Sequence, residues 1–410
     1  MPGLTSLSVY EGQGGYQSFK KAFAQKPEEI VEIVKASGLR GRGGAGFPAG
    51  LKWSFLAKDV FPRYLVCNAD ESEPGTCKDR ELLEKNPHLL IEGMILTSYA
   101  CQVGTAYIYY RGEFQHAADL MDKAIEEAYA KGYLGKNIMG SGMDLDLYTH
   151  LGAGAYICGE ESALLNSLEG RRGEPRLKPP FPAVEGLYAK PTVVNNVETL
   201  SAVPWIISEG AEKYAAIGTE KSKGTKLVSV SGHVKKPGNY EIVLGMSTRE
   251  LIYDLAGGIR DDNKLKAFIP GGSSTPMLPA DKVDVGYDYE SIQAAGSMLG
   301  SGALIVMDHT VNVVEATLRL SYFYMHESCG KCTPCREGTR WMWQILGKLQ
   351  AGIGTNGHVD KLLDICDNMS FKCFCPLGDA AVGPVASSIK NFRSDYEELV
   401  KKLQGGAVSV

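Results

Sequence analysis

Residues 144–170 read DLDLYTHLGAGAYICGEESALLNSLEG, and they combine the signals of a strand, a glycine-rich turn and a helix. Residues 144–152 predict a strand, and the apolar positions after Gly159 predict a helix. A helix that begins after glycines favours an anion or a hydroxyl-rich group at its N-terminus. Glu160 and Glu161 stand where phosphates would otherwise bind. Their carboxylates are therefore expected to accept hydrogen bonds from ribose or ribityl hydroxyls and to repel a 2′-phosphate.

Strands and helices alternate on the N-terminal side of this stretch. Strands are expected at residues 63–69 and 105–111, and helices at residues 87–101 and 114–131. This alternation is typical of an α/β fold with a mostly parallel sheet. Ligands of such sheets bind beyond the carboxyl ends of the strands.

Two polar clusters lie where such a ligand site is expected. One follows the first strand and offers Asn68, Asp70, Glu71 and Glu73. The other places on one predicted helical face Asn195, Asn196 and Thr199. Each cluster is also compatible with an ordinary turn or cap. Their placement after strands, together with glycine-rich loops, favours one shared pocket.

Residues 38–48, GLRGRGGAGFP, satisfy the G-x-G-x-x-G dinucleotide pattern from Gly41 onward. That pattern marks a Rossmann turn only after a strand. Here the preceding residues 26–37 predict a helix with acids in its first turn and a glycine stop. The loop is either a flexible linker or a different nucleotide loop. The cations Arg40, Arg42 and Lys52 suit a phosphate, and the second glycine-rich loop at residues 152–159 favours the nucleotide loop.

The composition is that of an ordinary globular protein, except that 48 of the 410 residues are glycine. A formal net charge of −5 argues against nucleic acid as the main partner. Neither a signal peptide nor an apolar run long enough for a membrane span is apparent. A cytosolic protein, free or docked on a membrane complex, is expected. Its ten cysteines are then metal ligands or buried thiols more often than disulfides.

The second half of the chain has a different pattern of predicted secondary structure. In residues 225–245, two runs of alternating apolar and polar residues flank Pro237-Gly238. This pattern predicts two strands joined by a turn, that is, a hairpin. A helix with a capping box of Ser247 and Glu250 follows, and then another strand at residues 266–272. Hairpin, helix and strand together predict a small β-grasp module. The chain is again helical from Thr310 onward.

The sequence ESCGKCTPCREG places three cysteines as C-x2-C-x2-C, and KCFCPLGDA adds Cys373 and Cys375. This spacing is typical of the ligands of a [4Fe-4S] cluster, with a proline after the remote ligand. Structural zinc usually takes two separated pairs, so zinc is the weaker alternative, and free thiols are weaker still. Cys375, which precedes Pro376, is favoured as the remote ligand over Cys373 and Cys366.

Six motifs in the same order resemble one family across nearly the whole chain: GLRGRGGAGFPAGLKW, CNADESEPGT, GAGAYICGEESALLNSLEG, NNVETL, ESCGKCTPCREG and CPLGDA. The family is the NADH-binding flavoprotein subunit of respiratory complex I, the 51 kDa subunit in mitochondria. The resemblance implies a Rossmann-like FMN and NADH domain, a β-grasp (SLBB-like) domain and a helical bundle with a [4Fe-4S] cluster. The boundaries expected from it are residues 1–48, 49–216, 217–309 and 310–410.

The resemblance also implies a role for individual residues. FMN would be held by Gly43, Gly44, Lys52, Asn68, Asp70, Gly159, Glu160, Asn195, Asn196 and Thr199. The rest of the glycine loop would also bind cofactor, through Gly41, Arg42, Ala45 and Gly46. The adenine of NADH would lie among Phe47, Phe55 and Phe181, and its nicotinamide and ribose against Glu71, Glu73, Glu161 and Lys178. The catalytic residues would be Glu73 and Tyr156, the latter against the flavin. The cluster ligands would be Cys329, Cys332, Cys335 and Cys375, and the neighbouring Cys373 departs from this simple pattern.

The implied activity is hydride transfer from NADH to FMN, followed by single-electron transfer to the cluster and onward toward quinone. The implied partners are a thioredoxin-like [2Fe-2S] subunit and a large iron–sulfur subunit, with the complex on the cytoplasmic side of the membrane. A diaphorase subunit of an NAD-reducing hydrogenase or formate dehydrogenase is the alternative within the same chemistry. A non-catalytic iron–sulfur scaffold is the alternative of another class.

Overall fold

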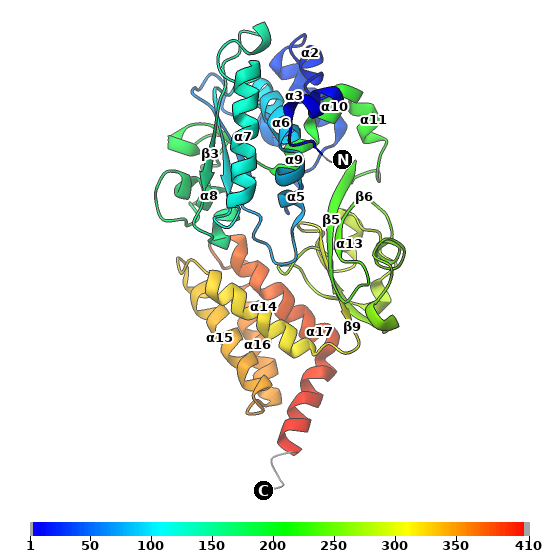
Figure 1. The fold of residues 1–410 in the computed structure, drawn as a ribbon. Helices are drawn as coiled ribbons and strands as arrows, with labels where there is room; N and C mark the ends of the chain where they lie inside the picture. Colours follow the sequence, from blue (N-terminus) through cyan, green and yellow to red (C-terminus); the bar gives the residue numbers. More distant parts are fainter. Residues whose placement is uncertain (1–2, 406–410) are drawn as a thin grey trace. The chain divides into compact units, whose positions relative to one another are not determined.

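The computed structural model describes residues 3–405, and the chain divides into two compact units (Figure 1). The first unit comprises Met1–Ser72, Thr76–Leu227 and Glu241–Gly245. The second comprises Glu73–Gly75, Val228–Tyr240 and Met246–Val410. No helix in the described part is long and apolar enough to cross a membrane.

The first unit is built on a parallel four-stranded sheet in the order β3-β2-β1-β4. The strands are β1 (Tyr64–Ala69), β2 (Thr105–Tyr110), β3 (Asp146–Leu151) and β4 (Thr192–Asn196). The central strand β1 reads YLVCNA and is largely buried, as expected for a parallel sheet covered on both faces. Its register sets Asn68 opposite Asn196, so both amides lie at the carboxyl edge of the sheet.

Helices surround this sheet (Figure 1). The longest are α6 (Pro87–Cys101) and α7 (Gln115–Lys131), and α6 is buried on almost every face. The N-terminal segment supplies α1 (Leu7–Gly12), α2 (Ser18–Ala22), α3 (Pro27–Ser37) and α4 (Ala49–Ser54). The remaining helices are α5 (Lys78–Lys85), α8 (Glu161–Leu168), α9 (Val197–Ser201), α10 (Val203–Glu209) and α11 (Ala211–Ala215). The structure confirms the predicted α/β class. It also confirms the predicted strands, which are β1 to β3, and the predicted helices, which are α3, α6 and α7.

One prediction about this unit is wrong. Asn195, Asn196 and Thr199 do not share a helical face, because β4 continues through Asn196 and α9 begins only at Val197. Asn196 is the N-cap of α9, with its Oδ1 accepting a hydrogen bond from the Glu198 N–H at 3.0 Å. The residues before it, Thr192 to Val194, are β-branched and buried, which favours a strand.

A five-stranded sheet has the order β6-β5-β9-β7-β8. Its strands are β5 (Thr225–Gly232), β6 (Gly238–Val243), β7 (Leu265–Ile269), β8 (Leu278–Pro279) and β9 (Ala303–Asp308). The predicted hairpin and the strand near residue 266 are confirmed, whereas the sequence patterns did not predict β9. Ser247 caps the short helix α12 (Thr248–Glu250) by accepting from the Arg249 N–H at 3.2 Å, so the predicted capping box with Glu250 is wrong and only the N-cap at Ser247 is confirmed. A further helix, α13 (Tyr289–Ala294), precedes β9.

Four helices follow as a bundle (Figure 1). They are α14 (Val313–Glu327), α15 (Thr333–Gln350), α16 (Asn356–Met369) and α17 (Pro376–Gly405). Their buried residues recur at helical spacing, as in α16 with Val359, Leu362, Ile365 and Cys366. The helical C-terminal region is therefore confirmed, and the three predicted cysteines of the C-x2-C-x2-C motif lie between α14 and the first turn of α15.

Candidate functional site

The glycine loop is a closed turn between the helices α3 and α4. The Gly41 N–H donates to the Phe47 carbonyl at 2.8 Å, and the Ala49 N–H donates to the Leu39 carbonyl at 2.9 Å. These bonds tie the two ends of the loop together. The pattern G-x-G-x-x-G therefore follows a helix, as the sequence indicated, and the loop is neither a Rossmann turn nor an unstructured linker.

A cavity of about 840 Å³ opens in the first unit, and the glycine loop forms one of its walls. Most of the predicted cofactor residues line it: Gly41, Gly43, Gly44, Ala45, Gly46, Phe47, Lys52, Phe55, Asn68, Gly159, Glu160, Glu161, Lys178, Phe181, Asn195, Asn196 and Thr199. Segments far apart in the sequence therefore meet around one space. The lining also includes Pro182, Ala183, Val184 and Val194, which the sequence reasoning missed because apolar residues of a loop and a strand carry no motif.

Four charged side chains form an ion network on the cavity wall. Lys52 Nζ lies 2.8 Å from Glu161 Oε2, and Lys178 Nζ lies 2.9 Å from Glu161 Oε1. Lys178 also lies 2.8 Å from Glu160 Oε1. Burial alone would raise the pKa of Glu161, but the two lysines outweigh burial and lower it to about 2. Glu161 is therefore an anion at every physiological pH, and it neutralises cations that would otherwise attract a phosphate.

Hydrogen bonds fix the polar groups at the carboxyl edge of the sheet. Glu160 Oε2 caps α8 by accepting from the N–H groups of Ser162 and Ala163 at 2.9 and 3.0 Å. Asn68 Nδ2 donates to the Gly159 carbonyl at 2.9 Å. Trp53 Nε1 donates to Asn195 Oδ1 at 2.8 Å. The wall is thus preorganised before any ligand binds.

Three phenylalanines of the lining are unusually open to solvent. The exposed fractions of Phe47, Phe55 and Phe181 are 46%, 53% and 57%. The ring centroids of Phe47 and Phe55 are 6.1 Å apart. Aromatic rings with free faces can stack on a planar base, so this part of the cavity suits an adenine.

The other five predicted residues do not line the cavity, and the cofactor roles of all the predicted residues stay predictions. Arg42 is buried, and its guanidinium donates to the Tyr214 hydroxyl at 3.0 Å and the Lys223 carbonyl at 2.6 Å. Only its backbone therefore belongs to the glycine loop. Asp70 follows β1, and Tyr156 begins the short turn Tyr156–Gly159 before α8.

Glu71 and Glu73 are engaged in other contacts. Glu71 caps α5, because its Oε1 accepts from the Asp79 N–H at 2.7 Å and its Oε2 from the Arg80 N–H at 3.0 Å. Burial and the nearby Asp79 raise the pKa of Glu71 to about 7. Glu73 belongs to the second unit, where its Oε1 accepts from the Ser274 N–H at 2.6 Å.

The cysteines of the two C-terminal motifs gather at the ends of α15 and α17. The Phe374 N–H donates to Cys332 Sγ at 3.3 Å, which joins the two motifs directly. Cys335 is buried in the first turn of α15, and burial raises its pKa to about 11 with Cys332 and Cys329 adding to the effect. Burial, and then Cys335, raise the pKa of the Cys373 thiol to about 12. The motifs that the sequence paired are therefore also together in space.

Cysteines drawn from two motifs are the ligand type that an iron–sulfur cluster takes. In the described part of the chain, no group of three or more His, Cys, Asp or Glu side chains is placed to hold a single metal ion. A [4Fe-4S] cube binds one thiolate at each of four separate irons. Because Cys373 packs beside Cys335 next to Gly378, the choice of Cys375 as the fourth ligand stays a prediction.

Family models match three consecutive parts of the chain. Residues 34–205 match the Nuo51 FMN-binding domain, residues 226–306 match the SLBB domain, and residues 315–399 match the NADH-ubiquinone oxidoreductase-F iron-sulfur binding region. The first match contains every residue of the cavity lining. The third contains all the cysteines of the C-terminal motifs. The residues therefore fit FMN in the first unit and an iron–sulfur cluster in the second.

Whole-chain comparisons agree with these matches. The chain is 56% identical to the F-subunit of NADH-quinone oxidoreductase from Streptomyces coelicolor over 96% of its length and 88% of that protein. It is 52% identical to F-subunit 2 of the same enzyme from Rhizobium meliloti over 95% of its length and 93% of that protein. A solved NAD+-reducing [NiFe]-hydrogenase has a TM-score of 0.84 and 39% identity, and the match covers 92% of this chain but 63% of the hydrogenase chain. The chain belongs to the F-subunit family of NADH-quinone oxidoreductase.

Proposed function

We propose that this chain takes electrons from NADH in the cavity of its first unit and delivers them to a [4Fe-4S] cluster held by Cys329, Cys332, Cys335 and Cys375. FMN supplies the essential chemistry when bound, because it accepts two electrons with a hydride and releases them one at a time. The chain's own residues bind, orient and select the two nucleotides, and they need no conventional general acid or base.

One observation carries this proposal. A single cavity collects a glycine loop, three sheet-edge amides, an ion network and three open phenylalanines from five separated segments. Bare backbone at the glycine loop allows close approach of a ribityl phosphate, and the amides of Asn68, Asn195 and Asn196 offer hydrogen bonds to a flavin. The phenylalanines offer stacking faces for an adenine. Such a double lining suits two stacked nucleotides better than one.

Roles for the remaining predicted residues follow from this arrangement. We assign Tyr156 to the flavin side and Glu73 to the nicotinamide side, as the family resemblance implies. Glu161 would select NADH over NADPH, since its charge already occupies both Lys52 and Lys178.

The relatives in this family are named as subunits of a quinone oxidoreductase, so we infer partner subunits. A thioredoxin-like [2Fe-2S] subunit and a large iron–sulfur subunit would take up the electrons after the cluster. The chain would then lie on the cytoplasmic side of a membrane as a peripheral part of the complex.

A second candidate rests on the similarity to the NAD+-reducing [NiFe]-hydrogenase. The same half-reaction would then serve a hydrogenase or a formate dehydrogenase. Genes for membrane subunits next to this one would support the quinone complex, and a neighbouring hydrogenase gene would support the alternative.

The test is a reconstitution of the full chain with FMN, iron and sulfide. We expect a yellow flavin spectrum, bleaching by NADH, and electron transfer from NADH to ferricyanide. A reconstituted protein that carries the cluster but shows no flavin band and no response to NADH would overturn the proposal and favour a non-catalytic iron–sulfur scaffold.

A further inference from the structure

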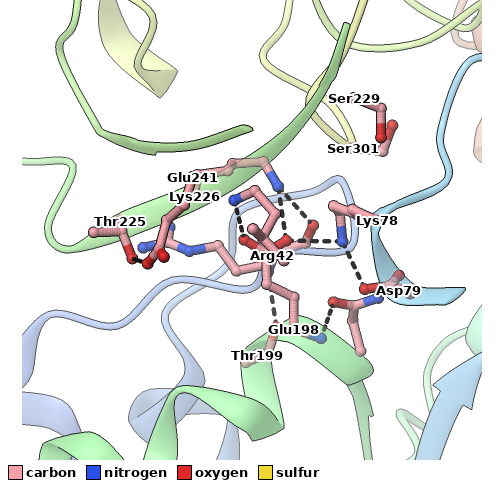
Figure 2. Close-up of polar contacts among 12 residues, drawn as sticks. Arg42, Lys78, Asp79, Glu198, Thr199, Thr225, Lys226, Ser229, Glu241 and Ser301 are labelled. Carbon is pink, nitrogen blue, oxygen red and sulfur yellow. Dashed lines mark hydrogen bonds and ion pairs between the residues drawn. The ribbon is translucent and has the colours of Figure 1, made fainter. Parts of the chain in front are cut away.

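A second group of charges lies in the first unit, outside the cavity lining (Figure 2). Glu198 is at its centre, and its Oε2 lies 2.8 Å from Lys78 Nζ and 3.0 Å from Lys226 Nζ. The other carboxylate oxygen accepts from the Leu227 N–H at 2.8 Å. The exposed side-chain fractions of Lys78, Glu198 and Lys226 are 1%, 9% and 0%, so this is a buried ion network.

Burial of these charges lowers the free energy of unfolding relative to exposed charges, because ions lose their hydration. Taking ions out of water costs free energy that mutual attraction seldom exceeds, and apolar replacements of buried ion pairs are often as stable. Burial lowers the pKa of Lys226 to about 7 although Glu198 opposes it, since Lys78 and Arg42 repel the same cation. Two buried lysines held between the carboxylates of Glu198 and Asp79 are therefore not explained by stability alone.

The network is connected to the cavity at two places. Lys226 Nζ donates to the Arg42 carbonyl at 3.3 Å, and Arg42 lies between the lining residues Gly41 and Gly43. Asp79, which pairs with Lys78 at 2.8 Å, accepts from Asn196 Nδ2 at 2.7 Å.

A third hydrogen bond joins the glycine loop at Arg42 to the helix α9, which begins just after Asn196. The Arg42 N–H donates to Thr199 Oγ1 at 2.8 Å, and Thr199 lies on the same short helix as Glu198. The buried ions thus touch the glycine loop through its backbone and the sheet edge through an amide. Figure 2 shows the linked contacts of Arg42, Lys78, Asp79, Glu198, Thr199 and Lys226.

We propose that Lys78, Asp79, Glu198 and Lys226 are positioning residues that hold the glycine loop and the β4–α9 junction in register for the flavin. None of them lines the cavity, so they act through Arg42, Asn196 and Thr199. The inference rests on the proposed function, because it assumes that the cavity binds FMN.

The test compares two buried carboxylates of the same unit. Glu198→Gln removes the centre of the network. Glu92→Gln is the matched control, since Glu92 is 2% exposed and accepts from the Tyr10 hydroxyl at 2.5 Å and the Tyr16 N–H at 2.8 Å, away from the cavity. The dissociation constant of FMN is measured by flavin fluorescence quenching on the full apo-chain, well below the midpoint of thermal unfolding.

We expect Glu198→Gln to weaken FMN binding about tenfold and Glu92→Gln to change it less than about twofold. Both variants are expected to lower the melting temperature. A purely structural role would lower the melting temperature of Glu198→Gln and leave the FMN affinity of the folded protein unchanged, and that result would overturn the inference.

A double variant, Glu198→Gln with Lys226→Met, covers the case in which the single variant does not fold. It leaves no unpaired charge at Lys226, so part of the thermal stability should return. FMN should still bind weakly, because the bond from Lys226 to the Arg42 carbonyl is gone. Wild-type affinity in the double variant would refute the positioning role.

Failure of the positioning role and failure of the proposed function give different results. If the unmodified chain itself binds no FMN, the proposed function is wrong. If the unmodified chain binds FMN and both network variants bind it equally well, only the positioning role is wrong.

Discussion

Glu161 is the residue whose surroundings most clearly predict a specificity. Both of its carboxylate oxygens are occupied, one by Lys52 and one by Lys178. Glu161→Gln would release Lys52 and leave Lys178 paired only with Glu160, so the cavity wall would attract a 2′-phosphate more strongly. We expect the ratio of kcat/KM for NADPH to that for NADH to rise about tenfold or more, since each new charged contact contributes on that scale. Steady-state ferricyanide reduction with each nucleotide measures this ratio.

Glu169→Gln provides the matched control for this specificity. It breaks a comparable ion pair, Glu169 with Arg176 at 2.8 Å, whose members do not line the cavity. The ratio should stay at its original value in this variant. Continued rejection of NADPH by Glu161→Gln would remove Glu161 from the selection of the nucleotide.

The low pKa of Glu161 also predicts a pH dependence of stability. Its pKa falls from 4.5 to about 2 in the folded chain, since Lys52 and Lys178 outweigh burial. The ionised carboxylate therefore stabilises the fold fully above pH 4.5, and this contribution is lost as the pH falls toward 2. The difference in free energy of unfolding between the unmodified chain and Glu161→Gln should shrink from neutral pH to about pH 3. Urea titrations at the two pH values measure it, and an unchanged difference would contradict the assignment.

At the scale of elements, the glycine loop is shaped by its contact with the end of β4. A Cβ added at Gly43 would lie 2.9 Å from the Cβ of Asn196, so one of the two walls would have to move. Gly43→Ala should weaken FMN binding about tenfold, which is the usual scale of overpacking. Fluorescence titration with FMN measures the effect.

Gly104→Ala is the control for the glycine loop. A Cβ added at Gly104 meets no atom within 4 Å, and Gly104 does not line the cavity. Equal FMN affinities in Gly43→Ala and Gly104→Ala would show that the contact with Asn196 does not shape the site.

The elements differ in how well the sequence predicts them. The helix α6 is predicted to the residue, because Pro87 marks its start and a long apolar run fixes its extent. The end of β4 is mistaken for a helix, because polar residues at 195, 196 and 199 fit helical spacing as well as a strand end. A short strand and a short helix in succession leave no periodicity long enough to separate them.

The residues of the site also differ in how well the sequence predicts them. The glycine loops and the amides of Asn68, Asn195 and Asn196 point correctly to the cavity walls, whereas Glu71 of the acidic cluster caps α5 and does not line the cavity. Arg42 resembles a phosphate ligand in the sequence, yet its side chain turns inward to Tyr214 and Lys223. The direction of one side chain in a loop depends on distant packing, which no local pattern records. The buried pairing of Glu198 with Lys226 escapes sequence reasoning for the same cause.

At the scale of the whole molecule, the two cofactor regions belong to different units. The cavity is lined entirely by the first unit, and the cysteine motifs belong to the second. Cys332→Ser should therefore remove the electron paramagnetic resonance signal of the cluster and leave FMN binding within about twofold of the original, since no cavity residue changes. Loss of both cofactors together would contradict this independence.

The fourth ligand can be identified with the same spectroscopy. Cys375→Ser should abolish or strongly diminish the cluster signal, because Cys375 stands before Pro376 as remote ferredoxin ligands do. Cys373→Ser should keep the signal. The reverse pattern would assign the ligand to Cys373, which packs beside Cys335.

The central claim is that electrons from NADH enter through a flavin in the cavity and reach the cluster of the same chain. An anaerobic titration of the reconstituted full chain with NADH tests it most directly, with the flavin absorbance and the cluster's electron paramagnetic resonance signal followed together. We predict that NADH bleaches the flavin and brings up the cluster signal, and that NADPH does neither. A cluster that dithionite reduces while NADH leaves both the flavin and the cluster unchanged would contradict the claim.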